Sequence, residues 1–402
     1  MERIYQYILQ EHLQHDRQMV FLAGPRQVGK TTISRTAASL TQQLIYLNWD
    51  YEEDQQLILA GPQAILNHYH LLVPQALRPI LIFDEIHKLK RWRNYLKGFY
   101  DKYTELMHFI VTGSAKLDIY RRSGDSLMGR YFPYRVHPLS VAELKRTIPA
   151  DGDIQLPQPL ATDLFTALIQ FGGFPEPFTR QNKPFYQRWN KLRSEQLFQL
   201  DIRELTRIHE LAQMQLLASI LKRQAGELIN YSSLAKLVRV SADTIQVWIN
   251  TLQSFYYCFE IKPWRKNITR SLIKQPKIYL WNWADGEDIG ARHENMIASH
   301  LLKAVHLWED RGLGEYGLYF LRDKEKREVD FLVTKNNRPW FLVEVKSQDT
   351  HSVSENLYYF QKQTQALHAF QVVIGMPYRE IDCFEYHTPI IVPALTFLSQ
   401  LV

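Results

Sequence analysis

The sequence predicts an α/β protein that begins with a parallel sheet covered by helices on both faces. Segments that are apolar almost throughout alternate with segments of helical periodicity, which is typical of strands buried on both sides. A glycine-rich turn separates the first such segment from the helical pattern after it, as expected for alternating strands and helices. The expected strands are 19–23, 44–47, 79–83 and 109–112, and helical patterns cover 4–13, the residues up to Leu40, and 92–103.

Four regions are predicted along the chain. The parallel-sheet core ends in a loop-forming stretch, 147–162, that contains prolines and a glycine. Further on, two short helices form a helix-turn-helix, with Ser241 as the N-cap of the second. Two strands after them, near 256–262 and 278–281, would form the wing of a winged helix. The predicted regions are 1–160 (core), 161–208 (helical), 209–285 (winged helix) and 286–402 (a second α/β domain).

The composition is that of a soluble, cytoplasmic protein. Of the 402 residues, 46% are hydrophobic and 22% charged, and the net charge of +6 weakly favours an acidic partner such as nucleic acid. The two cysteines, Cys258 and Cys383, lie far apart, so neither a disulfide nor a structural zinc site is expected. No secretion signal is evident, and no apolar stretch reaches the roughly 20 residues of a membrane helix.

The turn after the first strand has the pattern of a phosphate-binding loop, Gly-x-x-x-x-Gly-Lys-Thr. Glycines let the backbone turn its N–H groups toward phosphate oxygens, and the helix that follows adds its positive end. Lys30 is expected to contact the β- and γ-phosphates, and Thr31 to offer its hydroxyl to Mg²⁺. The residues expected to bind nucleotide in this loop are Gly24, Pro25, Arg26, Gln27, Val28, Gly29, Lys30, Thr31 and Thr32.

Two acidic residues follow the apolar strand 79–83. Asp84 is in the position of a carboxylate that holds Mg²⁺, and Glu85 is placed to orient or deprotonate the attacking water. Two acids at this point could instead cap the next helix. Together with Lys30, they favour a nucleotide-hydrolysing site.

Several short segments resemble one family, the bacterial and archaeal AAA+ ATPases that carry a C-terminal domain of unknown function. The segments are Gly113-Ser114, 126–130, Pro138-Leu139-Ser140 with Glu143, 172–176, and the winged-helix region. The resemblance covers nearly the whole chain. It implies an ATPase core that hydrolyses ATP with Mg²⁺, a helical lid at 161–208, a winged helix, a restriction-endonuclease-like end, and the possibility of a homo-oligomer.

The resemblance also suggests further residues of the ATP site. AAA+ proteins place a polar sensor on the strand between those of the two phosphate-site motifs, and Thr112 and Ser114 are both candidates; Ser114 could equally be a helix N-cap. Arg130 is a candidate for an arginine that meets the γ-phosphate, in cis or from a neighbouring subunit. Arg121 and Arg122 are alternative candidates for this role. Arg130 could equally pair with a nearby carboxylate in a purely structural role.

Charged residues recur on the predicted strands near the C-terminus. Glu344 and Lys346 share a strand face, as do Glu328 and Asp330, because side chains on a strand repeat every two residues. A hairpin would gather Asp330, Glu344 and Lys346 around one Mg²⁺, with Glu294 as a further acid from a helix. The arrangement resembles the PD-(D/E)xK nuclease core, although no proline precedes Asp330. Cleavage of DNA and a scaffold that holds DNA or a partner without chemistry both remain open.

Basic residues cluster around the helix-turn-helix and the wing. A one-sided positive surface would contact DNA phosphates, and Trp248, Tyr256 and Trp264 could stack on bases. In the alternative, this module packs between domains and the aromatic rings are core. The basic residues are Lys236, Arg239, Lys262, Arg265, Lys266, Arg270, Lys274 and Lys277.

Three functions follow for the whole chain: an ATP-driven enzyme acting on DNA, a regulatory switch with an inactive nuclease-like domain, or a nucleotide-binding scaffold without hydrolysis.

Overall fold

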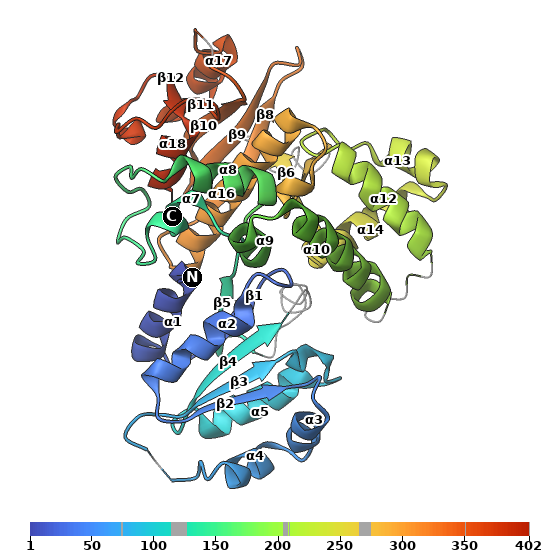
Figure 1. The fold of residues 1–402 in the computed structure, drawn as a ribbon, viewed down its shortest axis with the longest axis vertical. Helices are drawn as coiled ribbons and strands as arrows, with labels where there is room; N and C mark the ends of the chain where they lie inside the picture. Colours follow the sequence, from blue (N-terminus) through green and yellow to red (C-terminus); the bar gives the residue numbers. More distant parts are fainter. Residues whose placement is uncertain are drawn as a thin grey trace. The chain divides into compact units, whose positions relative to one another are not determined.

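The computed structural model divides into two compact units, each with its own sheet (Figure 1). The first unit consists of Met1–His137 with Arg146–Pro149, and the second of Pro138–Lys145 with Ala150–Val402. The structure describes residues 1–73, 75–113, 127–203, 208, 210–264, 275–349 and 351–401. Predicted residues that lie outside the described residues are Ser114, Arg121, Arg122, Arg265, Lys266, Arg270 and Lys274.

The sheet of the first unit is entirely parallel, with the strand order β2-β3-β4-β1-β5. Its four predicted strands are confirmed to within one residue at each end. Strand β4 is hydrogen-bonded between β1 and β3, which is the order that the family resemblance implied. Strand β5 was not predicted, because its residues alternate in burial and include Pro133. The bounds are β1 Met19–Ala23, β2 Leu44–Asn48, β3 Ile80–Asp84, β4 His108–Gly113 and β5 Tyr131–Arg135.

Helices pack against this sheet and bury both of its faces. Every residue of β1 and of β3 is buried, which explains their continuous apolar sequence. Helix α5 places Leu96 and Phe99 against the sheet, where the Phe99 ring packs on Phe83 and Phe109 at 5.8 and 5.2 Å. The helices are α1 Ile4–His15, α2 Lys30–Arg35, η1 Thr36–Leu40, α3 Glu52–Leu59, α4 Pro62–His68, η2 Ile86–Lys88 and α5 Trp92–Tyr103.

The second unit contains a seven-stranded mixed sheet of order β12-β11-β10-β9-β8-β6-β7. Strands β8, β9 and β10 are antiparallel neighbours, whereas β10, β11 and β12 run parallel. The predicted wing strands are β6 and β7; β6 pairs with β8, so they belong to the same sheet as the C-terminal strands. The bounds are β6 Cys258–Pro263, β7 Lys277–Leu280, β8 Tyr316–Arg322, β9 Glu328–Lys335, β10 Arg338–Lys346, β11 His368–Val373 and β12 Ile390–Pro393.

The predicted helix-turn-helix is present as α13 and α14. The hydroxyl of Ser241 accepts a hydrogen bond from the backbone N–H of Thr244 at 3.0 Å, so it is the N-cap that the sequence predicted. The helices of the second unit are α7 Val141–Lys145, α8 Thr162–Phe171, α9 Pro175–Arg180, α10 Lys183–Glu195, η4 Gln196–Ile202, α12 Leu211–Arg223, α13 Tyr231–Val238, α14 Ala242–Ser254, η5 Trp283–Asp285, α16 Ile289–Asp310, α17 Glu355–Thr364, η6 Cys383–Glu385 and α18 Ala394–Gln400.

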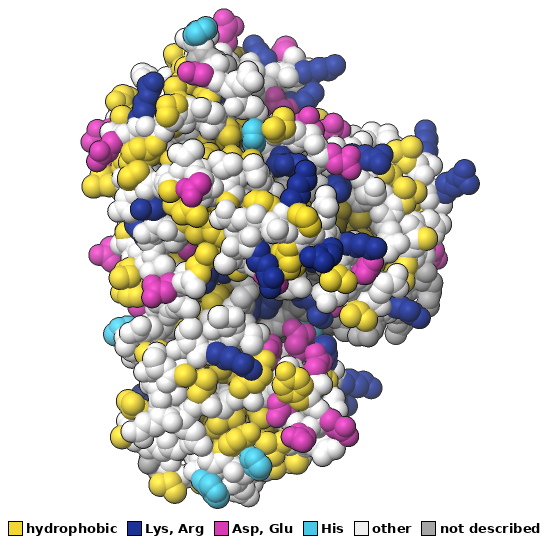
Figure 2. Space-filling view, in the orientation of Figure 1, with side chains coloured by type: hydrophobic (Ala, Val, Ile, Leu, Met, Phe, Trp, Pro, Cys, Tyr) yellow, Lys and Arg dark blue, Asp and Glu magenta, His cyan; other side chains and the backbone are white. Residues whose placement is uncertain are grey.

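The expected DNA-binding surface of this module is only partly present. Trp248 and Tyr256 are buried in the core, so they are not free to stack on bases. Lys277 is also buried, and the expectation that it lies on a basic surface is wrong. Lys236 and Arg239 are exposed. On the face drawn in Figure 2, Lys and Arg side chains are interspersed with acidic and hydrophobic side chains.

Two further predictions concern the cysteines and membrane-spanning helices. Cys258 and Cys383 are both buried and free. Among the helices of the described part of the chain, none has both the length and the apolar character needed to cross a membrane.

Candidate functional site

The phosphate-binding loop joins the carboxyl end of β1 to the start of α2. A Cβ atom at Gly24 would lie 2.3 Å from the carbonyl oxygen of Val136, so only glycine fits there. Gly29 has a φ of 99°, a conformation that side chains rarely adopt. The two glycines of the motif are therefore required by the backbone path.

The side chain of Lys30 lies inside this loop. Its ammonium donates hydrogen bonds to the carbonyl oxygens of Gly24 and Pro25, each at 2.8 Å. The residue is only 8% exposed. The loop thus holds a buried positive charge where the sequence predicts the β- and γ-phosphates.

Asp84, at the end of β3, is the centre of a group of hydroxyls. Its Oδ2 accepts hydrogen bonds from Thr31, at 3.0 Å, and from Tyr46. Its Oδ1 accepts a hydrogen bond from Thr112 at the end of β4. The predicted metal-binding pair, Thr31 and Asp84, is therefore brought together, and Thr112 is the candidate sensor that the described residues place beside it.

Tyr46 is not among the residues that the sequence predicts for this site. It lies on β2, where intermediate and buried residues alternate, so its face could not be known without the neighbouring strand. The guanidinium of Arg35 lies 4.2 Å from the centre of its ring. Burial, and then the hydrogen bond to Asp84, raise the pKa of Tyr46, so the phenol remains a donor.

Glu85 follows Asp84 in a left-handed backbone conformation, with a φ of 55°. Its Oε2 has no hydrogen-bond partner and lies 3.6 Å from Nε2 of His87. Burial raises the pKa of Glu85 above its usual range, whereas the charges of Lys30 and Arg26 lower it. A largely buried carboxylate oxygen without a hydrogen-bond donor is suited to accept a proton from water.

Arg130 does not reach the phosphate-binding loop of its own chain. Its guanidinium makes a two-point ion pair with Asp101 of α5, with distances of 2.6 and 3.1 Å. Its carbonyl accepts a hydrogen bond from Met19, at the amino end of β1. The loop follows the carboxyl end of the same strand, about 13 Å away at ~3.3 Å per residue. The expectation that Arg130 acts in cis is therefore wrong.

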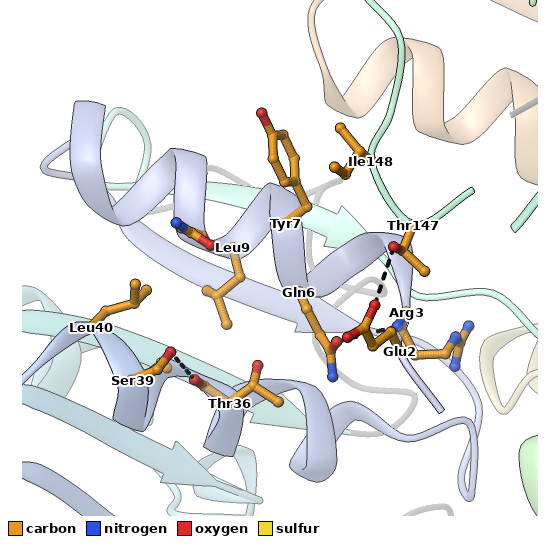
Figure 3. A pocket seen from close by; sticks show the side chains of 12 residues that line it. Glu2, Arg3, Gln6, Tyr7, Leu9, Thr36, Ser39, Leu40, Thr147 and Ile148 are labelled. Carbon is orange, nitrogen blue, oxygen red and sulfur yellow. Dashed lines mark hydrogen bonds between the residues drawn. The ribbon is translucent and has the colours of Figure 1, made fainter.

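A pocket of about 290 Å³ lies in the first unit, between α1 and the segment after the phosphate-binding loop (Figure 3). Arg3, which lines it, also donates hydrogen bonds to the carbonyl oxygens of Val28 and His137, at 2.8 and 2.7 Å. The pocket is therefore linked directly to the loop. Its lining residues are Glu2, Arg3, Gln6, Tyr7, Leu9, Gln10, Thr36, Ala37, Ser39, Leu40, Thr147 and Ile148.

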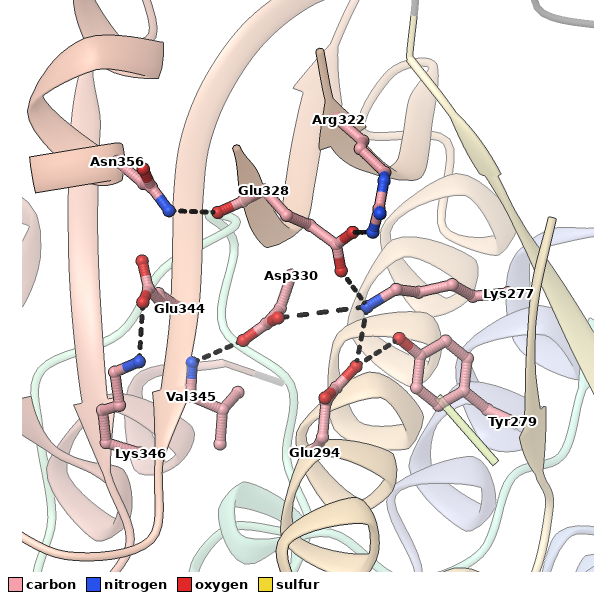
Figure 4. A network of polar contacts seen from close by, with 10 residues as sticks. All are labelled: Lys277, Tyr279, Glu294, Arg322, Glu328, Asp330, Glu344, Val345, Lys346 and Asn356. Carbon is pink, nitrogen blue, oxygen red and sulfur yellow. Dashed lines mark hydrogen bonds and ion pairs between the residues drawn. The ribbon is translucent and has the colours of Figure 1, made fainter. Parts of the chain in front are cut away.

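The predicted C-terminal acids do come together, but around a lysine (Figure 4). The ammonium of Lys277 lies 3.2 Å from Oε1 of Glu294, 2.6 Å from Oε1 of Glu328 and 4.0 Å from Oδ1 of Asp330. Tyr279 donates a hydrogen bond to the same oxygen of Glu294 at 2.7 Å. We call Lys277, Glu294, Glu328 and Asp330 the Lys277 cluster.

Further contacts hold the carboxylate oxygens of this cluster that do not pair with Lys277. Oδ2 of Asp330 accepts a hydrogen bond from the backbone N–H of Val345 at 2.8 Å, and Arg322 pairs with Oε2 of Glu328 at 2.5 Å. Glu344 is paired with Lys346 at 2.7 Å, and its other oxygen is buried without a hydrogen-bond partner. Each strand of the predicted hairpin therefore brings its charged residues to the same region.

Lysine side chains lie beside the acids that the sequence predicts as metal ligands. Among the described residues, no three His, Cys, Asp or Glu side chains are arranged so that they could hold a metal ion. Glu294 and Asp330 instead face the ammonium of Lys277, and Glu344 is paired with Lys346. In the described residues, lysine ammoniums lie beside the carboxylates of Glu294, Asp330 and Glu344, and the assignment of these acids as metal ligands stays a prediction.

Comparisons with known families match the chain in three parts. Residues 16–145 match the family described as AAA domain, and residues 162–284 and 289–391 match two families described as domains of unknown function. The chain is 24% identical, over 357 residues, to an uncharacterized protein of Mycobacterium bovis and to one of Mycobacterium tuberculosis. These alignments cover 85% of this chain and 73% of each relative.

Two solved structures are only weakly similar. One is PCH-2 of C. elegans, with 11% identity over 61% of this chain and 66% of that one, at a TM-score of 0.26. The other is Drosophila ORC bound to AT-rich DNA and Cdc6, with 10% identity over 69% of this chain and 86% of that one, at a TM-score of 0.25. These scores are too low to support an argument about the fold. The AAA match and the phosphate-binding loop support a nucleotide-binding ATPase.

Proposed function

We propose that the first unit binds ATP and hydrolyses it with Mg²⁺, using Lys30, Thr31, Asp84 and Glu85. The observation that carries the proposal is the hydrogen bond between Thr31 and Asp84, which unites the two motifs on neighbouring elements. A hydroxyl and a carboxylate are hard oxygen ligands of the kind that Mg²⁺ prefers beside phosphates, so these residues fit the ion. When bound, Mg²⁺ neutralises charge on the phosphates.

The chain's own residues supply the remaining steps. The ammonium of Lys30 exchanges the carbonyl oxygens of Gly24 and Pro25 for phosphate oxygens. Glu85 orients the attacking water and accepts its proton, because its Oε2 has no donor of its own. Thr112 holds Asp84 in place from the next strand.

The pocket beside Arg3 supports a place for the nucleoside. Arg3 contacts the loop through Val28, and the pocket carries apolar groups from Leu9 and Leu40 together with the polar ends of Glu2 and Gln6. A purine needs such a mixture of apolar contact and edge-directed hydrogen bonds. We place the adenine of ATP there.

The coupling of hydrolysis to DNA is a further part of the proposal. It rests on the exposed basic side chains of Lys236 and Arg239 at the end of α13. The buried positions of Trp248 and Tyr256 favour the second candidate, a regulatory switch that recruits a DNA or protein partner without cutting DNA. For Arg130, the ion pair with Asp101 supports the structural alternative, and contact with the γ-phosphate of a neighbouring subunit is the second candidate role.

ATP binding and phosphate release test the ATPase proposal. Titration calorimetry should show Mg²⁺-dependent ATP binding by the wild type and by Glu85→Gln, but not by Lys30→Ala. Phosphate release should be lost in both variants. A folded wild type without Mg²⁺-dependent ATP binding would overturn the proposal, and equal release by wild type and Glu85→Gln would overturn the role of Glu85.

DNA binding tests the contact proposed for Lys236 and Arg239. A gel-shift assay with duplex, single-stranded and branched DNA compares the wild type, with and without ATP, to Lys236→Glu/Arg239→Glu. Loss of binding in that variant, but not in the control Lys183→Glu on α10, supports DNA coupling. Equal binding by both variants would overturn the role of Lys236 and Arg239, and no binding by the wild type would leave a protein as the partner of the switch.

A further inference from the structure

The Lys277 cluster is built from three separate elements of the second unit. Lys277 comes from β7, Glu294 from α16, and Glu328 and Asp330 from β9. Figure 4 shows the three carboxylates turned toward the single ammonium between them. Because the contributing elements are far apart in sequence, the cluster exists only in the folded unit.

The backbone holds the lysine in this position. Lys277 pairs with Ile261 on β6 and forms an isolated bridge with Leu228. Its side chain is only 5% exposed, and the ammonium lies 5.7 Å from the centre of the Phe320 ring. A lysine fixed at its backbone and buried along its stem has little freedom to turn toward solvent.

The charges of the cluster support a permanent ammonium. The ammonium of Lys277 lies within 4.0 Å of a carboxylate oxygen of each of the three acids. Arg322, which pairs with Oε2 of Glu328, adds a second positive charge beside the three carboxylates, and the ammonium of Lys277 occupies the point between them.

We propose that the ammonium of Lys277 is the resident cation of this cluster and excludes divalent metal from it. The nuclease-like region would then be a metal-free structural centre. The proposal rests on the two distances from Nζ of Lys277 to the carboxylates of Glu294 and Glu328. A metal ion bound between these carboxylates would overlap the ammonium. The ATPase unit would accordingly drive an output other than metal-dependent cleavage of phosphodiesters.

Removal of the ammonium has a defined consequence. Lys277→Met keeps most of the stem but leaves Glu294, Glu328 and Asp330 facing one another without a positive charge between them. Carboxylates in this arrangement take up protons or a hard divalent cation. The variant should therefore gain a metal site that the wild type lacks.

Binding of Mn²⁺ without nucleotide tests the proposal, with free Mn²⁺ measured by electron paramagnetic resonance. Lys277→Met should bind one Mn²⁺ at least tenfold more tightly than the wild type, and Lys277→Met/Asp330→Asn should lose that gain. The matched control is Lys335→Met, because Lys335 is paired with a single carboxylate, that of Asp153, in the same unit. Circular dichroism verifies that each variant is folded.

Two results would overturn the proposal. One is a folded Lys277→Met that binds Mn²⁺ no better than the wild type. The other is wild-type protein whose Mn²⁺ binding disappears in Asp330→Asn, because metal would then already share the cluster. The second comparison requires no substitution of Lys277, so it decides the question even if Lys277→Met does not fold.

Discussion

The phenol of Tyr46 donates a hydrogen bond to Oδ2 of Asp84, the oxygen that also accepts the hydroxyl of Thr31. Strands β2 and β3 bring this about, since Asn48 pairs with Asp84 in their register and Tyr46 lies two residues earlier on the same face. Tyr46 therefore fixes the rotamer of the carboxylate that the proposal assigns to Mg²⁺.

Replacing Tyr46 by Phe should weaken the response to Mg²⁺ more than the binding of ATP. A hydrogen bond to a charged group contributes about 1.5–3 kcal/mol, so the Mg²⁺ concentration for half-maximal hydrolysis should rise about tenfold or more. Hydrolysis at a series of Mg²⁺ concentrations measures this, with Tyr51→Phe as the exposed control. A lower maximal rate with an unchanged Mg²⁺ response would contradict this role.

Hydrolysis should depend on the ionisation of Glu85. Because burial raises the pKa of Glu85, the carboxylate becomes protonated at a higher pH than an ordinary glutamate as the pH falls. The rate should therefore decline on the acid side through that raised pKa. Glu85→Gln should lower the rate by roughly 10²–10⁴-fold. The residual rate of Glu85→Gln should not decline at acid pH, whereas the rate of Glu52→Gln on α3 should. A decline that persists in Glu85→Gln would assign the ionisation to another group.

A methyl group at Gly24 should abolish ATP binding. It would lie 2.3 Å from the carbonyl oxygen of Val136, so the loop or β5 would have to shift. Gly98→Ala on α5 is the control, because nothing lies within 4 Å of its added Cβ, and it should stabilise the helix by about 0.5–1 kcal/mol. Urea denaturation and the ATP-induced shift in melting temperature measure both variants. Normal ATP binding by Gly24→Ala would show that this close approach is not needed.

The ion pair between Lys303 and Glu143 should be essential for the stability of the second unit. Both side chains are almost completely buried, and Lys303 also donates to the carbonyl of Pro138 at 2.9 Å. Lys303→Met leaves a buried carboxylate without its partner, which should cost about 3–5 kcal/mol of unfolding free energy. Urea denaturation should show a smaller loss when Glu143→Leu is added. Lys191→Ala, which breaks an exposed pair, should change stability by no more than about 1 kcal/mol.

Local sequence was sufficient for the phosphate-binding site. The strand, the loop and the helix that form it are contiguous, and the glycines, Lys30 and Thr31 follow from the backbone path and the charge of a phosphate. The strand order was implied by family resemblance rather than by pattern. Tyr46 was missed because a single tyrosine on a half-buried strand carries no sign of its partner.

The sequence by itself determined where the acids of the second unit lie along their strands, since side chains alternate with a fixed period of two. It also determined the loop that accepts phosphates. Only the tertiary structure decided the role of Lys277. In the sequence it belongs to a run of basic residues near a helix-turn-helix, but the pairing of β7 with β6 carries it into a buried group of carboxylates. Long-range strand pairing sets which charges meet, and burial makes their pairing obligatory.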